Sequence, residues 1–138
     1  MEIEIICQLI LATFLGALVG LEREYKRKRA GLQTYSLVAL GTCLFSIVPF
    51  ELNLNFDPTG IISAITIGIG FIGAGAVFHQ PSGTIGLTTA AGLWAVAAIG
   101  VAVGFKFYSL AIFTTFLTLL ILSGFGLLEE KFFKNNPL

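Results

Sequence analysis

Charged side chains are scarce in this chain of 138 residues, and their scarcity excludes an ordinary soluble domain. Asp, Glu, Lys and Arg make up 12% of the residues, about half of the roughly 25% found in soluble domains. Hydrophobic residues make up 56%, and the mean hydropathy is +0.92. The formal net charge is zero, so no basic bias indicates a nucleic-acid partner. This balance indicates a membrane protein.

Residues that carry catalytic or metal chemistry are also rare. His79 is the single histidine, and the two cysteines, Cys7 and Cys43, lie in apolar segments without metal or redox spacing. The sequence contains no nucleophile elbow, phosphate-binding loop or zinc motif. We therefore expect a protein that is not an enzyme and that has no cofactor and no metal site.

Five apolar segments are long enough to cross a bilayer, which takes about 20 residues per helix. The segments do not alternate in the way that strands of a membrane barrel do, so each should be helical. The sequence predicts an all-α polytopic bundle, a single domain over 1–138. The expected helices are at about 3–30, 32–50, 60–79, 85–104 and 107–128.

The basic residues predict the orientation of the bundle. Five of the eight Lys and Arg residues lie in the connection 22–31, whereas the connection 51–59 has none. Basic connections stay in the cytoplasm, so we expect the N-terminus outside and the C-terminus in the cytoplasm. Glu22 and Glu24 each precede a lysine by four residues, which favours helical ion pairs with Lys26 and Lys28. The first helix should therefore continue to Ala30, with Gly31 as its stop.

Glycines crowd the third predicted helix. Gly68 and Gly75 share one face of this helix, and Gly70 and Gly73 lie nearly opposite. Because glycine lets helix backbones approach closely in lipid, we expect the third helix to pack between two neighbours. A Gly70→Leu substitution should then prevent folding or assembly. The alternative is a helix that breaks and exposes carbonyl groups to an ion, as in transporters.

Small residues also mark the fourth predicted helix. Thr88, Ala91, Ala95, Ala98 and Ala102 recur with spacings of 3, 4, 3 and 4, which predicts a packing seam. Thr88 and Thr89 lie at the start of this helix. One interpretation is that their hydroxyls bond back to the backbone of the helix, and the other is that the free N–H groups of the first turn form an anion site. Further packing candidates are Trp94 and the glycine pairs Gly16 with Gly20 and Gly100 with Gly104.

Three blocks, in this order, resemble the signatures of the MgtC/SapB membrane family. They are Leu21–Glu24 with Ala30–Thr34, then Gly68–Gly75, then Gly86–Ala91 followed by Trp94, Gly100 and Gly104. The resemblance implies a bacterial inner-membrane protein with about five helices, linked to growth at low magnesium. Some members are thought to restrain the F-type ATP synthase. Better-known members carry a cytoplasmic C-terminal domain, which we do not expect here.

The resemblance predicts a protein that acts on membrane energetics through a partner when magnesium is limiting. Expected partners are the lipid bilayer, other copies of the chain in a homo-oligomer, and a membrane protein such as the F-type ATP synthase. The alternatives are an oligomeric channel or transporter for magnesium, another cation or a small solute, and an assembly subunit. The expected partner surface is Glu22, Arg23, Glu24, Gly31 and Thr34. The residues expected to set helix packing or a pathway are Gly68, Gly70, Gly73, Gly75, Gly86, Thr88, Thr89, Trp94, Gly100 and Gly104.

Overall fold

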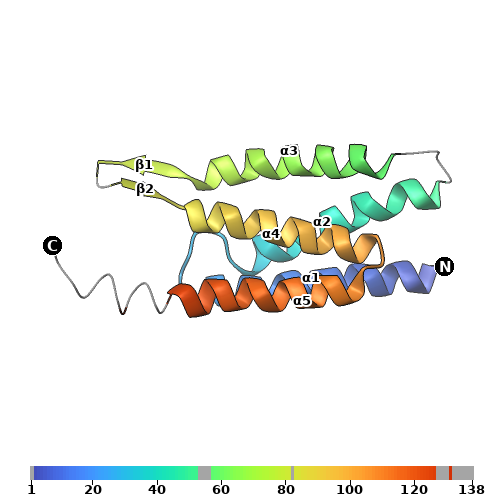
Figure 1. Ribbon diagram of the computed structural model, residues 1–138, viewed down its shortest axis with the longest axis horizontal. Helices are drawn as coiled ribbons and strands as arrows, with labels where there is room; N and C mark the ends of the chain where they lie inside the picture. Colours follow the sequence, from blue (N-terminus) through green and yellow to red (C-terminus); the bar gives the residue numbers. More distant parts are fainter. Residues whose placement is uncertain (1, 53–56, 82, 127–130, 132–138) are drawn as a thin grey trace.

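The computed structural model describes residues 2–52, 57–81, 83–126 and 131. The described residues form five long helices, which run side by side with a small hairpin at one end (Figure 1). Each helix is long and apolar enough to cross a membrane, which confirms the predicted all-α bundle. The side of the membrane that each end faces stays a prediction. The helices are α1 (Glu2–Tyr25), α2 (Leu32–Glu51), α3 (Pro58–Ala76), α4 (Leu87–Gly104) and α5 (Tyr108–Leu120), and α5 continues as the π-helix η1 (Ile121–Phe125).

Helices α2 and α4 lie at the centre of the packing. Helix α2 contacts α1 and α4 extensively, and α4 also contacts α1, α3 and α5. The core between them is built from small and branched side chains, among them Val19 of α1, Ala39 and Cys43 of α2, and Val96 and Ile99 of α4. Helix α3 lies at one edge of the bundle (Figure 1) and packs mainly on α4. In α3 only Ile69 and Gly73 are buried.

Helix α1 ends earlier than predicted. Its last residue is Tyr25, and the chain turns at Arg27, which adopts the left-handed backbone conformation with φ of 51°. The predicted stop at Gly31 is therefore wrong, because Gly31 precedes α2 as its N-cap residue. The predicted Glu22–Lys26 ion pair is present at 2.7 Å. Glu24 instead accepts a hydrogen bond from the backbone N–H of Leu32, at 3.2 Å.

The third and fourth helices are shorter than predicted, since a β-hairpin lies between them. Strand β1 (Phe78–Gln80) pairs antiparallel with β2 (Gly83–Ile85). Gly83 and Gly86 have φ values of 129° and 91°, a region that glycine adopts at little cost. A side chain at Gly86 would also collide with the backbone oxygen of Ala76. Gly83 lies in the connection predicted between the third and fourth helices, whereas Gly86 bends the chain where the fourth helix was expected to have begun.

Helix α3 begins two residues earlier than predicted. Asp57 is its N-cap, and one carboxylate oxygen accepts a hydrogen bond from the backbone N–H of Thr59 at 3.0 Å. Pro58 follows in the first helical turn, where its missing N–H has no consequence. Hydrogen bonding to Thr59 lowers the pKa of Asp57. The last two residues predicted for the fifth helix, 127 and 128, lie outside the described residues.

Candidate functional site

A group of polar side chains is buried near the end of the bundle that carries the connection 26–31 and the hairpin. We call this end the basic end. Arg23 of α1 is only 3% exposed, and its guanidinium donates to the hydroxyl of Thr89 at 3.3 Å. The hydroxyl of Tyr35 in α2 donates to the backbone oxygen of Thr89 at 3.2 Å. The first turn of α4 is therefore joined to both α1 and α2.

Glu22 extends this polar group toward α5. Its carboxylate lies 2.7 Å from the ammonium of Lys26 and 3.6 Å from the guanidinium of Arg23. The hydroxyl of Ser123, in the π-helix η1, donates to Glu22 at 3.4 Å. Lys26 in turn donates to the backbone oxygen of Leu122 at 2.8 Å. Single π-turns are frequent at functional sites. Here the π-helix η1 forms hydrogen bonds with Glu22 and Lys26 at the end of α1.

The hydrogen bonding of this group is incomplete within the described chain. The Nε atom of Arg23 and the Oε2 atom of Glu22 are buried and have no hydrogen-bond partner. Glu22 therefore lies between two cations, Lys26 and Arg23, and does not complete the hydrogen bonding of Arg23. Because a buried charge is costly unless it is well paired, the end of α1 should be sensitive to any change at Glu22.

Most residues of the predicted partner surface are not fully exposed, and their role in binding a partner stays a prediction. Arg23 and Gly31 are buried, and Glu22 and Thr34 are partly buried. Only Glu24 is exposed. A charged residue at the end of a helix usually lies on the surface. At the end of α1, however, the neighbouring helices α2, α4 and η1 enclose Arg23.

Glycines of α1 and α4 approach α2 from two helices. A Cβ atom built on Gly16 of α1 would lie 2.7 Å from both the Cβ of Ala39 and the backbone oxygen of Tyr35. A Cβ on Gly104 of α4 would lie 2.5 Å from the Cβ of Ser46. Gly20, Gly92 and Gly100 make similarly close approaches to α2. The helix packed between glycine-bearing neighbours is therefore α2.

Building a Cβ atom on each glycine of α3 in the same way corrects the prediction for this helix. Cβ atoms built on Gly68, Gly70 and Gly75 would meet nothing within 4 Å, and only Gly73 has a neighbour, Ala90, at 3.5 Å. Helix α3 is also continuous from Pro58 to Ala76. Within one chain α3 is thus neither packed on both sides nor broken at mid-membrane. The expectation that Gly70→Leu prevents folding is not supported, because space is open there.

Part of the small-residue seam predicted on α4 does not pack against other helices of the chain. Thr88, Ala91 and Ala98 are exposed. The buried face carries Thr89 together with Gly92, Gly100 and Gly104, because the glycines admit α2. Trp94 is 53% exposed and lines a smaller recess between α3 and α4.

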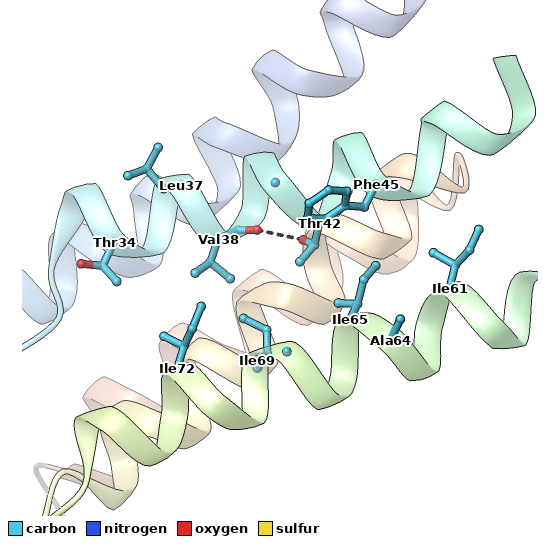
Figure 2. A pocket seen from close by; sticks show the side chains of 12 residues that line it. Thr34, Leu37, Val38, Thr42, Phe45, Ile61, Ala64, Ile65, Ile69 and Ile72 are labelled. Carbon is cyan, nitrogen blue, oxygen red and sulfur yellow. Dashed lines mark hydrogen bonds between the residues drawn. The ribbon is translucent and has the colours of Figure 1, made fainter. Parts of the chain in front are cut away.

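An open apolar groove separates α2 from α3 (Figure 2). Its volume is about 750 Å³. Thr42 in its wall is already hydrogen-bonded, through its hydroxyl, to the backbone oxygen of Val38 at 2.9 Å. The groove is lined by Thr34, Leu37, Val38, Gly41, Thr42, Phe45, Ile61, Ala64, Ile65, Gly68, Ile69 and Ile72.

The opposite end of the bundle has its own polar contacts. The side-chain amide of Gln8 donates to the backbone oxygens of Val103 and Gly104 at 2.9 and 3.2 Å. Lys106 pairs with Glu4 at 2.6 Å, and this hydrogen bond raises the pKa of Lys106. Sequence reasoning did not single out Gln8 or Tyr35, although each is a polar residue inside an apolar segment.

The described residues contain no group of three or more His, Cys, Asp or Glu side chains that could hold a metal ion. The charged side chains instead gather at the two ends, as the ion pairs at Glu22 and Glu4 show. The middle of the bundle offers backbone packing and apolar surface.

Several known proteins are similar in sequence to this chain along two thirds or more of its length. The putative magnesium transporter YhiD of Escherichia coli K12 is 38% identical over 144 residues, which cover 99% of this chain and 67% of YhiD. Protein SapB of Bacillus subtilis is 38% identical over 127 residues, covering 86% of this chain and 54% of SapB. Protein MgtC of Brucella abortus is 42% identical over 93 residues, covering 67% of this chain and 39% of MgtC. No solved structure matches the chain.

This chain thus spans between 39% and 67% of the length of these three relatives. Residues 9–131 match the MgtC family, a range that includes all three sequence blocks and reaches into all five helices. The predicted resemblance is confirmed: this multi-pass membrane protein belongs to the MgtC family.

Proposed function

We propose that the protein is a non-enzymatic protein of the bacterial inner membrane, and that it acts under magnesium limitation by binding another membrane protein through α3. The observation that carries the proposal is the outer face of α3. Its residues recur with spacings of 3, 4, 3 and 4 and are all exposed. We call this set the α3 seam: Gly60, Ser63, Ile67, Gly70 and Ala74.

The α3 seam has the properties of a helix-packing surface that lacks its helix. Cβ atoms built on Gly60 and Gly70 would meet nothing within 4 Å, and Ile67 is 76% exposed. Small residues at heptad spacing let a second helix approach closely in lipid. The glycines of α1 and α4 contact α2 within the chain, whereas the glycines of the α3 seam contact no other helix of the chain.

The distribution of charge favours action through a partner over ion transport by this chain. Residues 5–21, 32–50, 58–76, 87–104 and 107–126 contain no Asp, Glu, Lys, Arg or His. Ion pathways are usually marked by ionisable groups within the membrane, and magnesium requires oxygen ligands and keeps much of its water. A transported ion would have to rely on other copies of the chain.

The link to magnesium comes from the relatives, two of which are named a putative magnesium transporter and MgtC. Family resemblance suggests the F-type ATP synthase as the partner. The test is ATP-driven proton pumping in inverted vesicles that contain the unmodified protein, Gly70→Leu or Gly75→Leu. Gly75 is also open and on α3, but it lies off the seam.

The unmodified protein and Gly75→Leu should lower proton pumping, and Gly70→Leu should not, although it is present in the membrane. If Gly70→Leu lowered pumping as the unmodified protein does, the α3 seam would not be the contact. Magnesium or solute flux into liposomes that contain only this protein would favour the channel or transporter instead.

A further inference from the structure

The groove between α2 and α3 has the shape of a site for a thin, flexible chain. Thr34 and Ile72 lie at one end and Phe45 and Ile61 toward the other (Figure 2). From Thr34 to Phe45 the wall rises by about 16 Å along α2. The groove holds about 750 Å³, and its length along the two helices suits a single extended chain.

The wall of the groove suits hydrocarbon. Gly41 and Gly68 widen it from the two sides, and a Cβ atom on either would meet nothing within 4 Å. The hydroxyl of Thr42 is already bonded within α2, so the middle of the wall offers no free hydrogen-bonding group. This surface would therefore be filled by an apolar chain in the bilayer.

The end of the groove at Thr34 and Ile72 lies toward a concentration of positive charge. Arg27, Lys28 and Arg29 are exposed and form no ion pair within the described part of the chain. The guanidinium of Arg29 lies 4.0 Å over the ring of Phe78, so it bridges the connection before α2 and the strand after α3. Of the acids on this side, Glu24 bonds to Leu32 and Glu22 to Lys26.

We propose that the groove binds an acyl chain of an anionic phospholipid whose phosphate contacts Arg27, Lys28 and Arg29. Hydrocarbon in the groove and positive charge at its mouth match the two parts of such a lipid. The positive-inside bias predicts that the basic end faces the cytoplasm, where the leaflet is anionic. This site is separate from the α3 seam and does not depend on the proposed function.

Native mass spectrometry of the purified full chain tests the charge requirement. The probes are dioleoylphosphatidylglycerol and dioleoylphosphatidylcholine, which share their acyl chains and differ in charge. The unmodified protein should retain the anionic lipid preferentially. Each basic residue removed should weaken its binding about fivefold, so the triple variant Arg27→Gln, Lys28→Gln, Arg29→Gln should lose on the order of 100-fold. Equal retention of both lipids would overturn the proposal.

The groove itself is tested by filling it. Gly68→Leu and Gly41→Leu have room for the new side chain, so both should fold, as circular dichroism would check, and both should lose bound lipid. Gly70→Leu, on the other face of α3, should retain it. If the two groove variants bound the anionic lipid as the unmodified protein does, the site would lie elsewhere. Cross-linking of Leu37→Cys to a second copy of the chain would likewise overturn the proposal.

Discussion

Gly16→Ala should destabilise the bundle, although alanine is the better helix former. The added Cβ would lie 2.7 Å from the Cβ of Ala39 and from the backbone oxygen of Tyr35, and 3.3 Å from the Cα of Ser36. Carbon atoms in contact lie about 3.5–4.0 Å apart, so α1 and α2 would have to separate by roughly 1 Å. A gap of that size forfeits about a quarter to a half of the dispersion energy of the contacts that it opens.

The expected cost follows from overpacking and helix propensity together. Overpacking typically costs about 1–3 kcal/mol, and the better propensity of alanine offsets at most about 1 kcal/mol. Gly41→Ala in α2 is the matched control, because its Cβ would meet nothing within 4 Å. Both variants gain the same propensity, so the difference in unfolding free energy between them isolates the overpacking and should be about 1–3 kcal/mol.

The assay is reversible unfolding by sodium dodecyl sulfate in mixed micelles, followed by far-ultraviolet circular dichroism. Gly41→Ala should be as stable as the unmodified protein or slightly more so, and Gly16→Ala should unfold at lower detergent fractions. Equal stability of the two variants would show that α1 does not approach α2 as closely as the structure has it.

Three further predictions concern the two ends of the bundle and the thiols. Glu22→Gln should lower the unfolding free energy by about 3 kcal/mol in the same assay, because it leaves Arg23 buried without a carboxylate; an unchanged value would mean that Glu22 contributes nothing to the buried group. A maleimide should modify Cys7, which is exposed, and spare Cys43, which is buried, until the protein unfolds; modification of both thiols in the folded protein would contradict the core. The contribution of the Lys106–Glu4 pair should be present below the unfolded-state pKa of lysine and be lost as the pH rises through the raised pKa of Lys106; an alkaline loss of stability that persisted in Lys106→Gln would have another origin.

The number and type of the helices could be predicted from the sequence because lipid leaves the backbone no other choice. Long uncharged segments had to be helical, and the spacing of Glu22 and Lys26 predicted their ion pair correctly. The hairpin could not be predicted, because strands of three residues carry almost no pattern of their own. Helix α1 ends earlier than predicted because the backbone of Arg27 adopts the left-handed conformation. Nothing in the sequence around Arg27 indicated this conformation.

The order of the helices in space could not be read from the sequence either. In a soluble protein the buried face is the apolar one, but here core and lipid are equally apolar. Gly16 and Gly104 contact α2 while Gly68 and Gly70 face open space. The four-residue spacing of Gly16 with Gly20 and of Gly100 with Gly104 indicated packing, but it could not show that the denser glycines of α3 lack a neighbour within the chain. The burial of Arg23 was not predicted for a related reason. Arg23 is buried because other helices pack around the end of α1, and the sequence did not show where those helices lie.

Site-specific photo-cross-linking tests most directly whether the protein acts through the α3 seam. A photoreactive phenylalanine analogue would replace Ile67 on the seam or Phe116 on α5, both of which are exposed, in cells grown at low magnesium. We expect a cross-link from position 67 to one identified membrane protein other than the chain itself, and none from position 116. The same adducts from both positions, or from position 67 only to lipid or to a second copy, would contradict this expectation.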